Sequence, residues 1–371
     1  MKIGITGNEG FIGKHLSNNL RLFPDEFQQI DFKKDYFKNQ EKLIQFVESC
    51  DVIIHLAAMN RHEDPEVIFN TNVELVNLLI EALEIAKSKA HVIFSSSLQE
   101  ERDNVYGKSK KKGRDQFTEW AKRSGGKFTG ILIPNVFGPF GRPYYNSVIA
   151  TFCHQLTNNE QPRIDVDGNL KLIYVGDLAR KIIDEIRGGF GNNNLTIPHT
   201  NEIKVSAILN LLEGYKSNYL DSGIIPLLTD SFEINLFNTF RCYMDLKQRF
   251  PVKFVQHADQ RGAFVELIKL NVGGQVSFST TLSGITRGNH YHTRKIERFA
   301  VIKGEALIQL RRVGTNDIFN FYLSGESPAY VDMPIWYSHN IKNIGQDELY
   351  TVFWINEFFN PADPDTYFEN V

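Results

Sequence analysis

Two histidines and a glutamate within residues 288–299, GNHYHTRKIERF, could bind a metal ion. His290 and His292 are separated by one residue, and Glu297 follows in the same stretch. Two or three imidazoles with a carboxylate suit a divalent transition metal that keeps a vacant position for water or substrate. We expect zinc first, with iron, manganese and nickel as alternatives. The same histidines could instead line a polar cavity without metal, or hold a metal that only stiffens the fold.

A glycine-rich segment near the N-terminus could bind a dinucleotide. Residues 6–13, TGNEGFIG, follow a strand-like run and open a helical one. The first two glycines let the backbone turn tightly and approach a pyrophosphate, the third lets helix and strand pack closely, and the helix start supplies amide donors. The expected cofactor-binding residues of this segment are Gly7, Gly10, Phe11, Ile12 and Gly13.

Three charged residues after the second predicted strand bear on the choice of dinucleotide. Asp31 is placed where an acid can hydrogen-bond the ribose 2′-hydroxyl of NAD. Lys33 and Lys34 could instead neutralise the 2′-phosphate of NADP. All three could also form a solvated charge cluster, so the residues alone leave this choice open.

A tyrosine and a lysine could carry out proton transfer. Tyr106 and Lys110 are four residues apart on a predicted helix and so share a face, and Ser97 follows a predicted strand. The lysine ammonium would favour the tyrosinate and hold the nicotinamide ribose, so that the phenol exchanges a proton with a carbonyl or hydroxyl oxygen. The serine hydroxyl would steady that oxygen. We expect the rest of KSKKKGR, residues 108–114, to be a solvated helix face.

The elements that position these groups fall into two regions of different texture. Up to about residue 185, short apolar runs alternate with amphipathic stretches, which predicts βαβ units around a parallel sheet. From Val252 onward, short β-rich runs follow one another with turns between them, which predicts an all-β barrel or sandwich. We therefore expect domains at residues 1–247 and 248–371. The predicted strands are 2–6, 27–31, 51–56, 90–95 and 128–134, and the predicted long helix is 66–87.

Composition and charge exclude several classes of protein. The chain has 371 residues, of which 42% are hydrophobic and 23% charged, and its formal net charge of −3 argues against nucleic acid and membrane surfaces as partners. Neither an apolar leader nor a bilayer-length apolar run is evident, so we expect a cytoplasmic protein. Cys50, Cys153 and Cys242 form no metal-binding pattern, and we expect them to be reduced.

The motifs of the first region, taken in order, resemble those of the extended short-chain dehydrogenase/reductases. They are TGNEGFIG, DVIIHLAA, NTNV, YGKSK, PNVFGPFG and YVGDLA. The resemblance implies a Rossmann-type domain, NADP(H) or NAD(H), and a nucleotide-sugar substrate. It assigns catalysis to Ser97, the last of a serine run, with Tyr106 and Lys110. The usual arginine before YVGD is absent, and the gap between Ser97 and Tyr106 is shorter than in most members.

The same resemblance implies further binding residues. Asp51 is expected near the adenine, and Asn135 and Asn146 near the sugar nucleotide. The other residues expected at the cofactor are Leu56, Ala57, Ala58 and Asn72, together with Tyr106 and Lys110 themselves.

The second region resembles the cupins. GITRGNHYHTRKIERFAVIKG, residues 284–304, is similar to the first cupin motif, which implies that His290, His292 and Glu297 point into a β-barrel. PIWYSHNIKN resembles the second motif and adds His339, but Trp336 stands where that motif usually has glycine. DQRGAFVE, residues 259–266, looks like a strand that takes part in dimer formation in sugar-epimerase cupins, so we expect a homodimer.

A reductase fused to an epimerase-like cupin resembles the bifunctional enzymes of bacterial capsule and O-antigen nucleotide-sugar synthesis. The resemblance implies epimerisation at C3 of a UDP-4-keto-6-deoxy sugar in the cupin, followed by NADPH-dependent reduction at C4. Two alternatives are a reductase whose cupin is passive and a dinucleotide-binding sensor without turnover. Candidates for the base of the epimerisation are Tyr291, Tyr337, Lys295 and His257.

Overall fold

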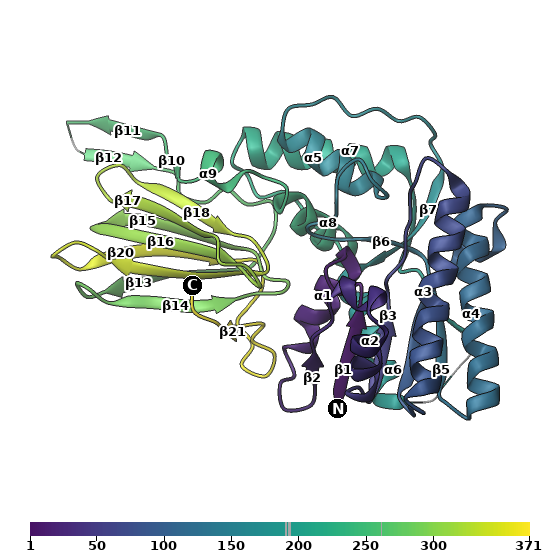
Figure 1. The fold of residues 1–371 in the computed structure, drawn as a ribbon. Coiled ribbons are helices and arrows are strands. Elements are labelled where there is room, and N and C mark those ends of the chain that lie inside the picture. Colours follow the sequence, from purple (N-terminus) through teal and green to yellow (C-terminus); the bar gives the residue numbers. More distant parts are fainter. Residues whose placement is uncertain (190, 192–193, 261) are drawn as a thin grey trace. The chain divides into compact units, whose positions relative to one another are not determined.

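A computed structural model describes residues 1–189, 191, 194–260 and 262–371. These residues form two compact units, each built from several stretches of chain (Figure 1). Unit 1 comprises residues 1–137, 145–147 and 168–204, and unit 2 comprises 138–144, 148–167 and 205–371. The helices of residues 205–249 thus belong to the same unit as the C-terminal strands. The expected boundary after residue 247 would separate most of these helices from the strands, and it stays a prediction.

A parallel sheet forms the centre of unit 1. Its strand order is β2-β1-β3-β4-β5-β8, and every neighbouring pair is parallel. The predicted α/β fold is confirmed, and the predicted strands agree with these to within two residues. The strands are β1 (Lys2–Thr6), β2 (Gln28–Ile30), β3 (Val52–His55), β4 (His91–Ser97), β5 (Phe128–Ile133) and β8 (Leu195–Thr196).

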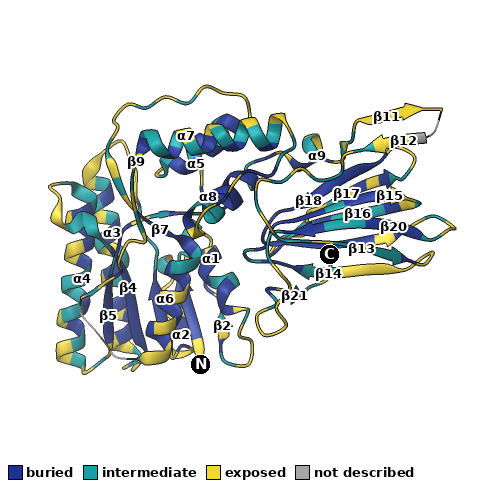
Figure 2. Ribbon diagram, turned by 180° about the vertical axis from the view of Figure 1, so that it is seen from behind, coloured by how far each residue is buried: buried dark blue, intermediate teal, exposed yellow. Residues whose placement is uncertain are grey.

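Helices cover both faces of this sheet because successive strand residues point to opposite sides. Ile54 packs in one core with α1 and α6, whereas Ile53 packs in the other with α2, α3 and α4. Figure 2 shows the strands as buried and the outer helix surfaces as largely exposed. The helices are α1 (Phe11–Leu20), η1 (Lys34–Lys38), α2 (Gln40–Glu48), α3 (Pro65–Ile85), η2 (Leu98–Glu101), α4 (Val105–Ser124) and α6 (Val175–Gly188).

A small mixed sheet that the sequence analysis did not anticipate completes unit 1. Its middle strand is β7 (Asn169–Tyr174), which pairs parallel with β6 (Asn135–Phe137) and antiparallel with β9 (Asn201–Lys204). These strands are short and only partly buried, so they lack the continuous apolar runs by which the other strands were predicted.

Unit 2 contains two five-stranded antiparallel sheets, which confirms the all-β C-terminal region. Their orders are β10-β18-β15-β20-β13 and β17-β16-β19-β14-β21, and a separate hairpin joins β11 to β12. Arg261 of that hairpin lies outside the described residues. The strands are β10 (Val252–Lys253), β11 (Gln256–Asp259), β12 (Gly262–Val265), β13 (Gln275–Thr281), β14 (Thr286–Tyr291), β15 (Glu297–Lys303), β16 (Glu305–Arg312), β17 (Ile318–Ser324), β18 (Ala329–Met333), β19 (Tyr337–Asn343), β20 (Leu349–Ile355) and β21 (Tyr367–Phe368).

The helices of unit 2 attach to the sheets through a buried ion pair. Arg298 of β15 donates to Asp332 of β18 through Nε at 2.7 Å and Nη2 at 3.0 Å, and the Tyr219 hydroxyl donates to the same carboxylate at 2.6 Å. This network explains why residues before 248 belong to the unit of the C-terminal strands. The helices are α5 (Val148–Thr157), α7 (Val205–Tyr215), η3 (Lys216–Asp221), α8 (Ser231–Arg241) and α9 (Leu246–Arg249).

Two further expectations bear on the chain as a whole. Cys50, Cys153 and Cys242 are free thiols, as expected. Over the part of the chain that the structure describes, none of the helices has the combination of length and hydropathy that crossing a bilayer requires.

Candidate functional site

The glycine segment forms a tight cradle at the carboxyl end of β1. Gly7 has φ of +75°, and a Cβ added there would lie 2.8 Å from the Ala57 nitrogen. A Cβ on Gly13 would lie 2.2 Å from the Gly7 oxygen, so the start of α1 can approach only because the side chain is missing. Residues 56–58 leave β3 beside this cradle, with Leu56 N donating to Thr6 O at 3.1 Å. The arrangement fits a dinucleotide pyrophosphate at the helix N-terminus.

The charged residues that bear on cofactor choice lie close to this cradle. Asn8 Nδ2 donates to Phe32 O at 3.1 Å and so ties the glycine segment to the loop that follows β2. Asp31, Lys33 and Lys34 on this loop are all exposed. A carboxylate and two ammonium groups are therefore available on the same loop.

Asp51 does not lie where the resemblance placed it. Its carboxylate accepts a hydrogen bond from Lys2 N at 2.7 Å, at the amino end of β1, because Ile3 pairs with Val52 in the parallel register. Dinucleotides bind at the carboxyl ends of such strands, where Gly7 lies. The expected contact between Asp51 and the adenine is therefore wrong.

Asn72 is buried and hydrogen-bonds two neighbouring segments of the chain. Its Oδ1 accepts from Met59 N at 2.6 Å, while Nδ2 donates to Met59 O and to Ser109 Oγ, both at 3.0 Å. The side chain thus fixes the loop after β3 against helix α4. Asn135 and Asn146 are exposed in unit 1, and their role at the sugar nucleotide stays a prediction.

Helix α4 brings Tyr106 and Lys110 together as predicted. The Lys110 ammonium is 6.0 Å from the centre of the Tyr106 ring and 4.4 Å from that of Phe94, and it donates to Ser95 Oγ at 3.5 Å. Burial lowers the pKa of Lys110 to about 7, an effect that the Glu100 carboxylate partly opposes. Burial raises the pKa of Tyr106 to about 12, with a smaller contribution from Tyr145.

Burial decides the protonation state of Tyr106. We expected the Lys110 ammonium to favour the tyrosinate, but burial disfavours the charged phenolate. The phenol is therefore protonated at neutral pH. A protonated phenol is the form that can donate a proton to an alkoxide formed by ketone reduction.

The three serines at the end of β4 have different partners. Ser95 Oγ donates to His55 O at 3.2 Å, Ser96 donates to Glu100, and Ser97 accepts from Gln99 N at 3.1 Å as the cap of η2. Ser97 is the least buried of the three. Its catalytic role stays a prediction.

Sequence reasoning missed an ion pair beside Tyr106 and Lys110. Arg114 donates to Glu100 through Nε at 3.0 and 3.1 Å and through Nη2 at 2.7 Å, and the two side chains are only 12% and 5% exposed. Arg114 is therefore not part of a solvated helix face, unlike Lys108, Lys111 and Lys112. The pair connects η2 to α4. The sequence feature that could have indicated this pair is Glu100 in one segment and Arg114, one helical turn after Lys110, in the next.

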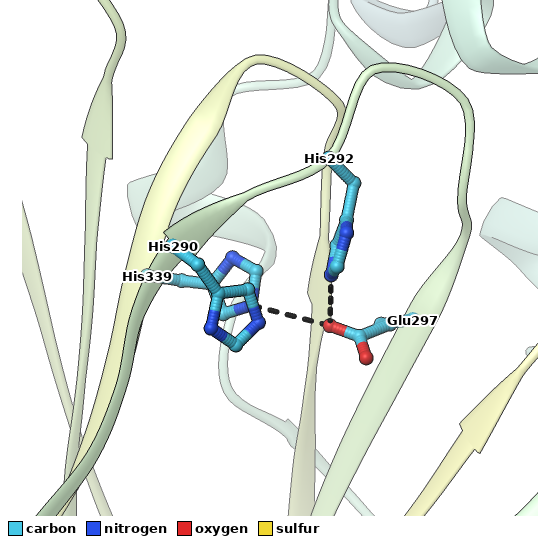
Figure 3. Close-up of side chains that lie close together, drawn as sticks. All are labelled: His290, His292, Glu297 and His339. Atoms are coloured by element: carbon cyan, nitrogen blue, oxygen red, sulfur yellow. Dashed lines mark hydrogen bonds and ion pairs between the residues drawn. The ribbon is translucent and has the colours of Figure 1, made fainter. Parts of the chain in front are cut away.

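The metal-binding candidates converge from two sheets of unit 2 (Figure 3). His290 lies on β14, His339 on its neighbour β19, and Glu297 at the start of β15 in the other sheet, while His292 follows β14. One ligand atom from each residue lies within 4.8 Å of the others. A bulge with Asn289 at φ of +62° precedes His290 and sets its pairing with His339.

The hydrogen bonds of the histidines fit a metal ion. His292 and His339 direct Nε2 at the same Glu297 oxygen, at 3.0 and 3.2 Å. Their Nδ1 atoms face the carbonyls of Asp365 and Tyr337, so Nδ1 carries the proton and Nε2 presents its lone pair. Lone pairs that face a carboxylate require a proton or a cation between them. A divalent cation meets that requirement for all four residues.

The pKa shifts of Glu297 and His290 agree with this set of ligands. Burial would raise the pKa of Glu297, but positive charge on His292 and His339, with a proton on each Nε2 in the place of the cation, lowers it below its usual range. Burial would lower the pKa of His292, but the Glu297 carboxylate raises it. Burial lowers the pKa of His290 to about 4, helped by His339 and His292. An ionised carboxylate and a neutral imidazole at neutral pH are the forms that bind metal.

Trp336, the departure from the second cupin motif, keeps the backbone that glycine would have. Its φ is +62°, its N–H donates to His292 O at 2.8 Å, and its ring stacks on Tyr291 with centroids 5.6 Å apart. The left-handed conformation costs a non-glycine residue about 1 kcal/mol or more, and burial of the indole offsets this cost. Trp336 therefore adopts a conformation that glycine would reach without this cost.

The candidate bases differ in their surroundings. Lys295 is buried and its ammonium donates to Pro364 O at 2.5 Å, and Tyr291 is stacked between Trp336 and Tyr367. Burial raises the pKa of Tyr337, and His257 is exposed on β11. These contacts give Lys295 and Tyr291 structural roles.

The fold and the two groups of residues define a class of protein. A doubly wound sheet with a glycine cradle and a tyrosine–lysine pair is that of a dinucleotide-dependent oxidoreductase, here joined to an all-β domain with a metal-type ligand set. Residues 3–184 match the NAD dependent epimerase/dehydratase family, and residues 257–367 match the polysaccharide biosynthesis C-terminal domain.

Full-length relatives share both parts. UDP-2-acetamido-2,6-beta-L-arabino-hexul-4-ose reductase of Pseudomonas aeruginosa is 31% identical over 99% of this chain and 98% of its own length. The crystal structure of the capsular polysaccharide assembling protein CapF from Staphylococcus aureus matches with 34% identity over the whole of both chains and a TM-score of 0.63. RMD from P. aeruginosa, solved with NADPH, shares only the fold, at 19% identity over 58% of this chain and 82% of its own, with a TM-score of 0.53. The chain belongs to the family of the P. aeruginosa reductase and is an NAD(P)H-dependent oxidoreductase.

Proposed function

We propose that the chain is a bifunctional nucleotide-sugar enzyme. The C-terminal domain inverts C3 of a UDP-2-acetamido-2,6-dideoxy-4-hexulose, and the N-terminal domain then reduces C4. The product is a UDP-2-acetamido-2,6-dideoxy-L-talose-type sugar on the path to UDP-N-acetyl-L-fucosamine. The observation that carries this proposal is the presence of two groups in one chain, Tyr106 with Lys110 and the cluster of three histidines with Glu297.

The chemistry of a 4-keto sugar explains why the two groups occur together. The ketone acidifies the hydrogen at C3, because the enolate left by its removal is stabilised by the carbonyl, and the same ketone accepts hydride. His290, His292, Glu297 and His339 would hold a divalent metal, zinc first, and the metal would supply Lewis acidity toward the ketone oxygen. The ionised Glu297 carboxylate and the neutral His290 imidazole are suited to that ion.

The reduction uses residues of unit 1. The nicotinamide supplies the hydride, and the glycine cradle and Lys110 hold the cofactor. Tyr106 then donates its phenolic proton to the oxygen at C4, and Ser97 hydrogen-bonds that oxygen. Lys33 and Lys34 support a preference for NADPH, with the 2′-phosphate between them, over NADH bound through Asp31.

The remaining expectations also belong to this proposal. The UDP-sugar is the partner in both reactions, and neither nucleic acid nor a membrane is required. We place the enzyme in the cytoplasm as a homodimer, with the hairpin of β11 and β12 taking part in the contact between subunits.

Deuterium exchange without cofactor tests the two activities separately. In D2O, the 4-keto substrate should take up deuterium at C3 in the absence of NADPH, because enolisation precedes hydride transfer and does not require it. His290→Ala and His292→Ala should suppress this uptake, because they remove imidazoles that hold the ion. Tyr106→Phe should leave the uptake intact and abolish reduction, because only the proton donor is lost. NMR of the sugar and NADPH oxidation measure the two outcomes.

The same experiment discriminates among the alternatives. If the parent protein shows no uptake above the uncatalysed background but still reduces the ketone, the C-terminal domain is passive. If uptake persists in both histidine variants after chelation, the metal has only a structural role. Binding of NADPH without turnover of any UDP-4-keto sugar would favour the alternative of a dinucleotide-binding sensor.

A further inference from the structure

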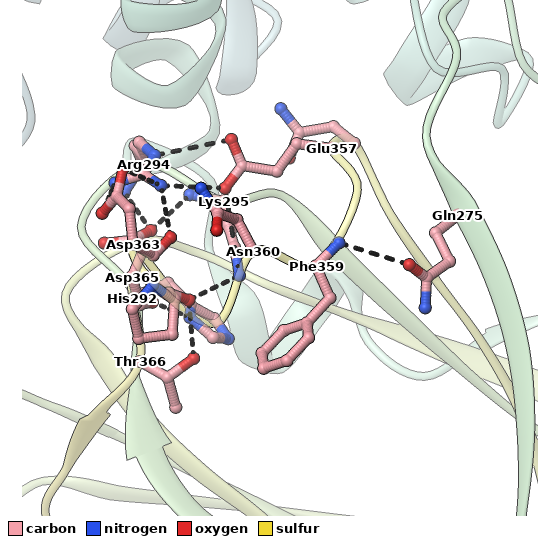
Figure 4. Close-up of polar contacts among 12 residues, drawn as sticks. Gln275, His292, Arg294, Lys295, Glu357, Phe359, Asn360, Asp363, Asp365 and Thr366 are labelled. Atoms are coloured by element: carbon pink, nitrogen blue, oxygen red, sulfur yellow. Dashed lines mark hydrogen bonds and ion pairs between the residues drawn. The ribbon is translucent and has the colours of Figure 1, made fainter.

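A short loop connects two of the candidate metal ligands. Thr293, Arg294 and Lys295 lie between His292 and the strand that begins at Glu297. Among the described residues, the main-chain groups of this loop form no hydrogen bonds with one another. The loop is instead folded around a residue of the C-terminal segment (Figure 4).

That residue is Asp365, whose carboxylate accepts four hydrogen bonds from the loop. Oδ1 accepts from Thr293 N at 3.0 Å and from Thr293 Oγ1 at 2.6 Å. Oδ2 accepts from Arg294 N and Lys295 N, both at 3.0 Å. Three successive main-chain N–H groups that converge on one carboxylate form an anion-binding nest, and here the anion comes from the chain itself.

The main chain of Asp365 acts on the same site. Its carbonyl oxygen accepts the hydrogen bond from His292 Nδ1. Asp365 is 2% exposed and has φ of +41°, a left-handed conformation that aspartate tolerates better than most residues. This conformation lets the carboxylate face the loop while the carbonyl faces the imidazole.

Contacts of the surrounding segment hold Asp365 in place. Lys295 Nζ donates to Pro364 O at 2.5 Å, and Arg294 reaches Asp363 through Nη1 at 3.1 Å and Glu357 through Nη2 at 3.2 Å. The side chains of Arg294 and Lys295 therefore bind the C-terminal segment, while the Asp365 carboxylate binds the main-chain N–H groups of the loop.

We propose that Asp365 is a positioning residue of the metal centre, which sets the ring orientation of His292 and the separation between His292 and Glu297. The inference rests on the metal centre of the proposed function. A second partner on the far nitrogen of a ligating histidine fixes its tautomer and orientation, and losing such a partner typically weakens metal binding by about 10- to 100-fold. Asp365 supplies that partner and also holds the loop between the two ligands.

Metal titration of the full chain tests this role without any turnover. Zn2+ binding to the parent, Asp365→Asn and Asp365→Ala is measured in competition with a chromophoric chelator, and the absorption spectrum of bound Co2+ reports the ligand geometry. Asp365→Asn keeps the main-chain carbonyl but turns an amide NH2 toward N–H donors. Because the carbonyl partner of His292 remains, we expect Zn2+ binding to weaken by about tenfold, the lower end of that range, and the Co2+ spectrum to change.

The matched control is Asp317→Asn, which alters an exposed carboxylate between β16 and β17 and which should bind Zn2+ as the parent does. If Asp365→Ala does not fold, Thr293→Val, which removes only the hydroxyl bond to Oδ1, should weaken binding in the same direction by a smaller factor. Unchanged Zn2+ affinity with a lowered thermal midpoint in the Asp365 variants would overturn the inference and leave the metal centre standing. A parent protein that binds neither Zn2+ nor Co2+ would overturn both.

Discussion

Lys110 and Tyr106 are both withdrawn from water, and burial shifts their pKa values in opposite directions. Each side chain is moved toward its neutral form, because desolvation penalises the charged one. For Tyr106 this favours the protonated form, which is the form that a reductase needs. His55 lies beneath the pair and is also kept neutral, since burial and the charge of Lys110 lower its pKa to about 3. None of these shifts follows from residue type or spacing alone.

The two lysines after β2 carry the prediction on cofactor choice. Replacing Lys33 and Lys34 together with alanine should raise the KM for NADPH about tenfold and leave that for NADH nearly unchanged, because only contacts to the 2′-phosphate are lost. Steady-state kinetics with both cofactors measure this. Lys38→Ala, another exposed lysine of the same segment, is the control. Equal use of NADPH and NADH by the parent protein would contradict the preference.

At the scale of elements, the short connection between β4 and α4 is held by charge. The helix η2 occupies this connection, and Glu100 joins it to Arg114 of α4 and to Ser96 of β4. Close approach also matters here, since a Cβ on Gly107 would lie 2.0 Å from Gln99 O. Ser97, Tyr106 and Lys110 are thereby fixed to one another despite the short gap noted in the sequence.

Glu100→Gln should move the pH dependence of reduction. The Glu100 carboxylate raises the pKa of Lys110, so its removal should lower that pKa further below its ordinary value. The Lys110 ammonium would then be lost at a lower pH, and the alkaline limb of the pH–rate profile should shift toward acid. Loss of the charge-assisted hydrogen bonds from Arg114 should also cost about 1 to 3 kcal/mol of stability.

The neighbouring Glu101→Gln is the control for this variant, because Glu101 is exposed in the same helix. It should leave both the profile and the stability unchanged. An identical alkaline limb for Glu100→Gln and the parent protein would show that Glu100 does not act on Lys110.

Elements with continuous apolar runs could be predicted from the sequence, because parallel strands are buried on both faces. The sequence did not show at which end of its strand a residue lies. Asp51 is in the expected motif, yet it immediately precedes β3 and therefore lies away from the glycine cradle. The spacing of His290, His292 and Glu297 drew attention to the cluster, and the resemblance to the cupin motifs supplied His339. Asp365 escaped notice because it is 73 residues from His292, and only the fold brings the two together.

At the scale of the whole molecule, buried neutral histidines make stability depend on pH. Burial lowers the pKa of His55 to about 3 and that of His91 to about 4, with smaller contributions from Lys110 and Lys127. The unfolded chain, with ordinary histidine pKa values, then binds protons that the folded chain excludes. Their contribution to stability is therefore fully present above about pH 6.5 and is lost as the pH falls toward 4 and 3.

His91→Gln should flatten this dependence. As the pH falls from about 6.5 to 4, each of these histidines lowers the free energy of unfolding by about 1.4 kcal/mol per pH unit. The variant lacks one of the two histidines. Urea unfolding at several pH values, followed by tryptophan fluorescence, measures the slope, since Trp120 is fully buried in unit 1. His62→Gln, at an exposed histidine, should keep the parent slope. A parent slope in the His91 variant would contradict the assignment.

The path of the chain between the two units limits how such a protein can be divided. The chain passes from one unit to the other after residues 137, 144, 147, 167 and 204, so no single break separates them. A gene encoding only residues 248–371 would lack Tyr219, which bonds Asp332, and Arg241, which donates to Met333 O at 3.0 Å. The C-terminal sheets expressed without the preceding helices would therefore lose these buried partners, and such a fragment should be less stable than the same residues in the whole chain.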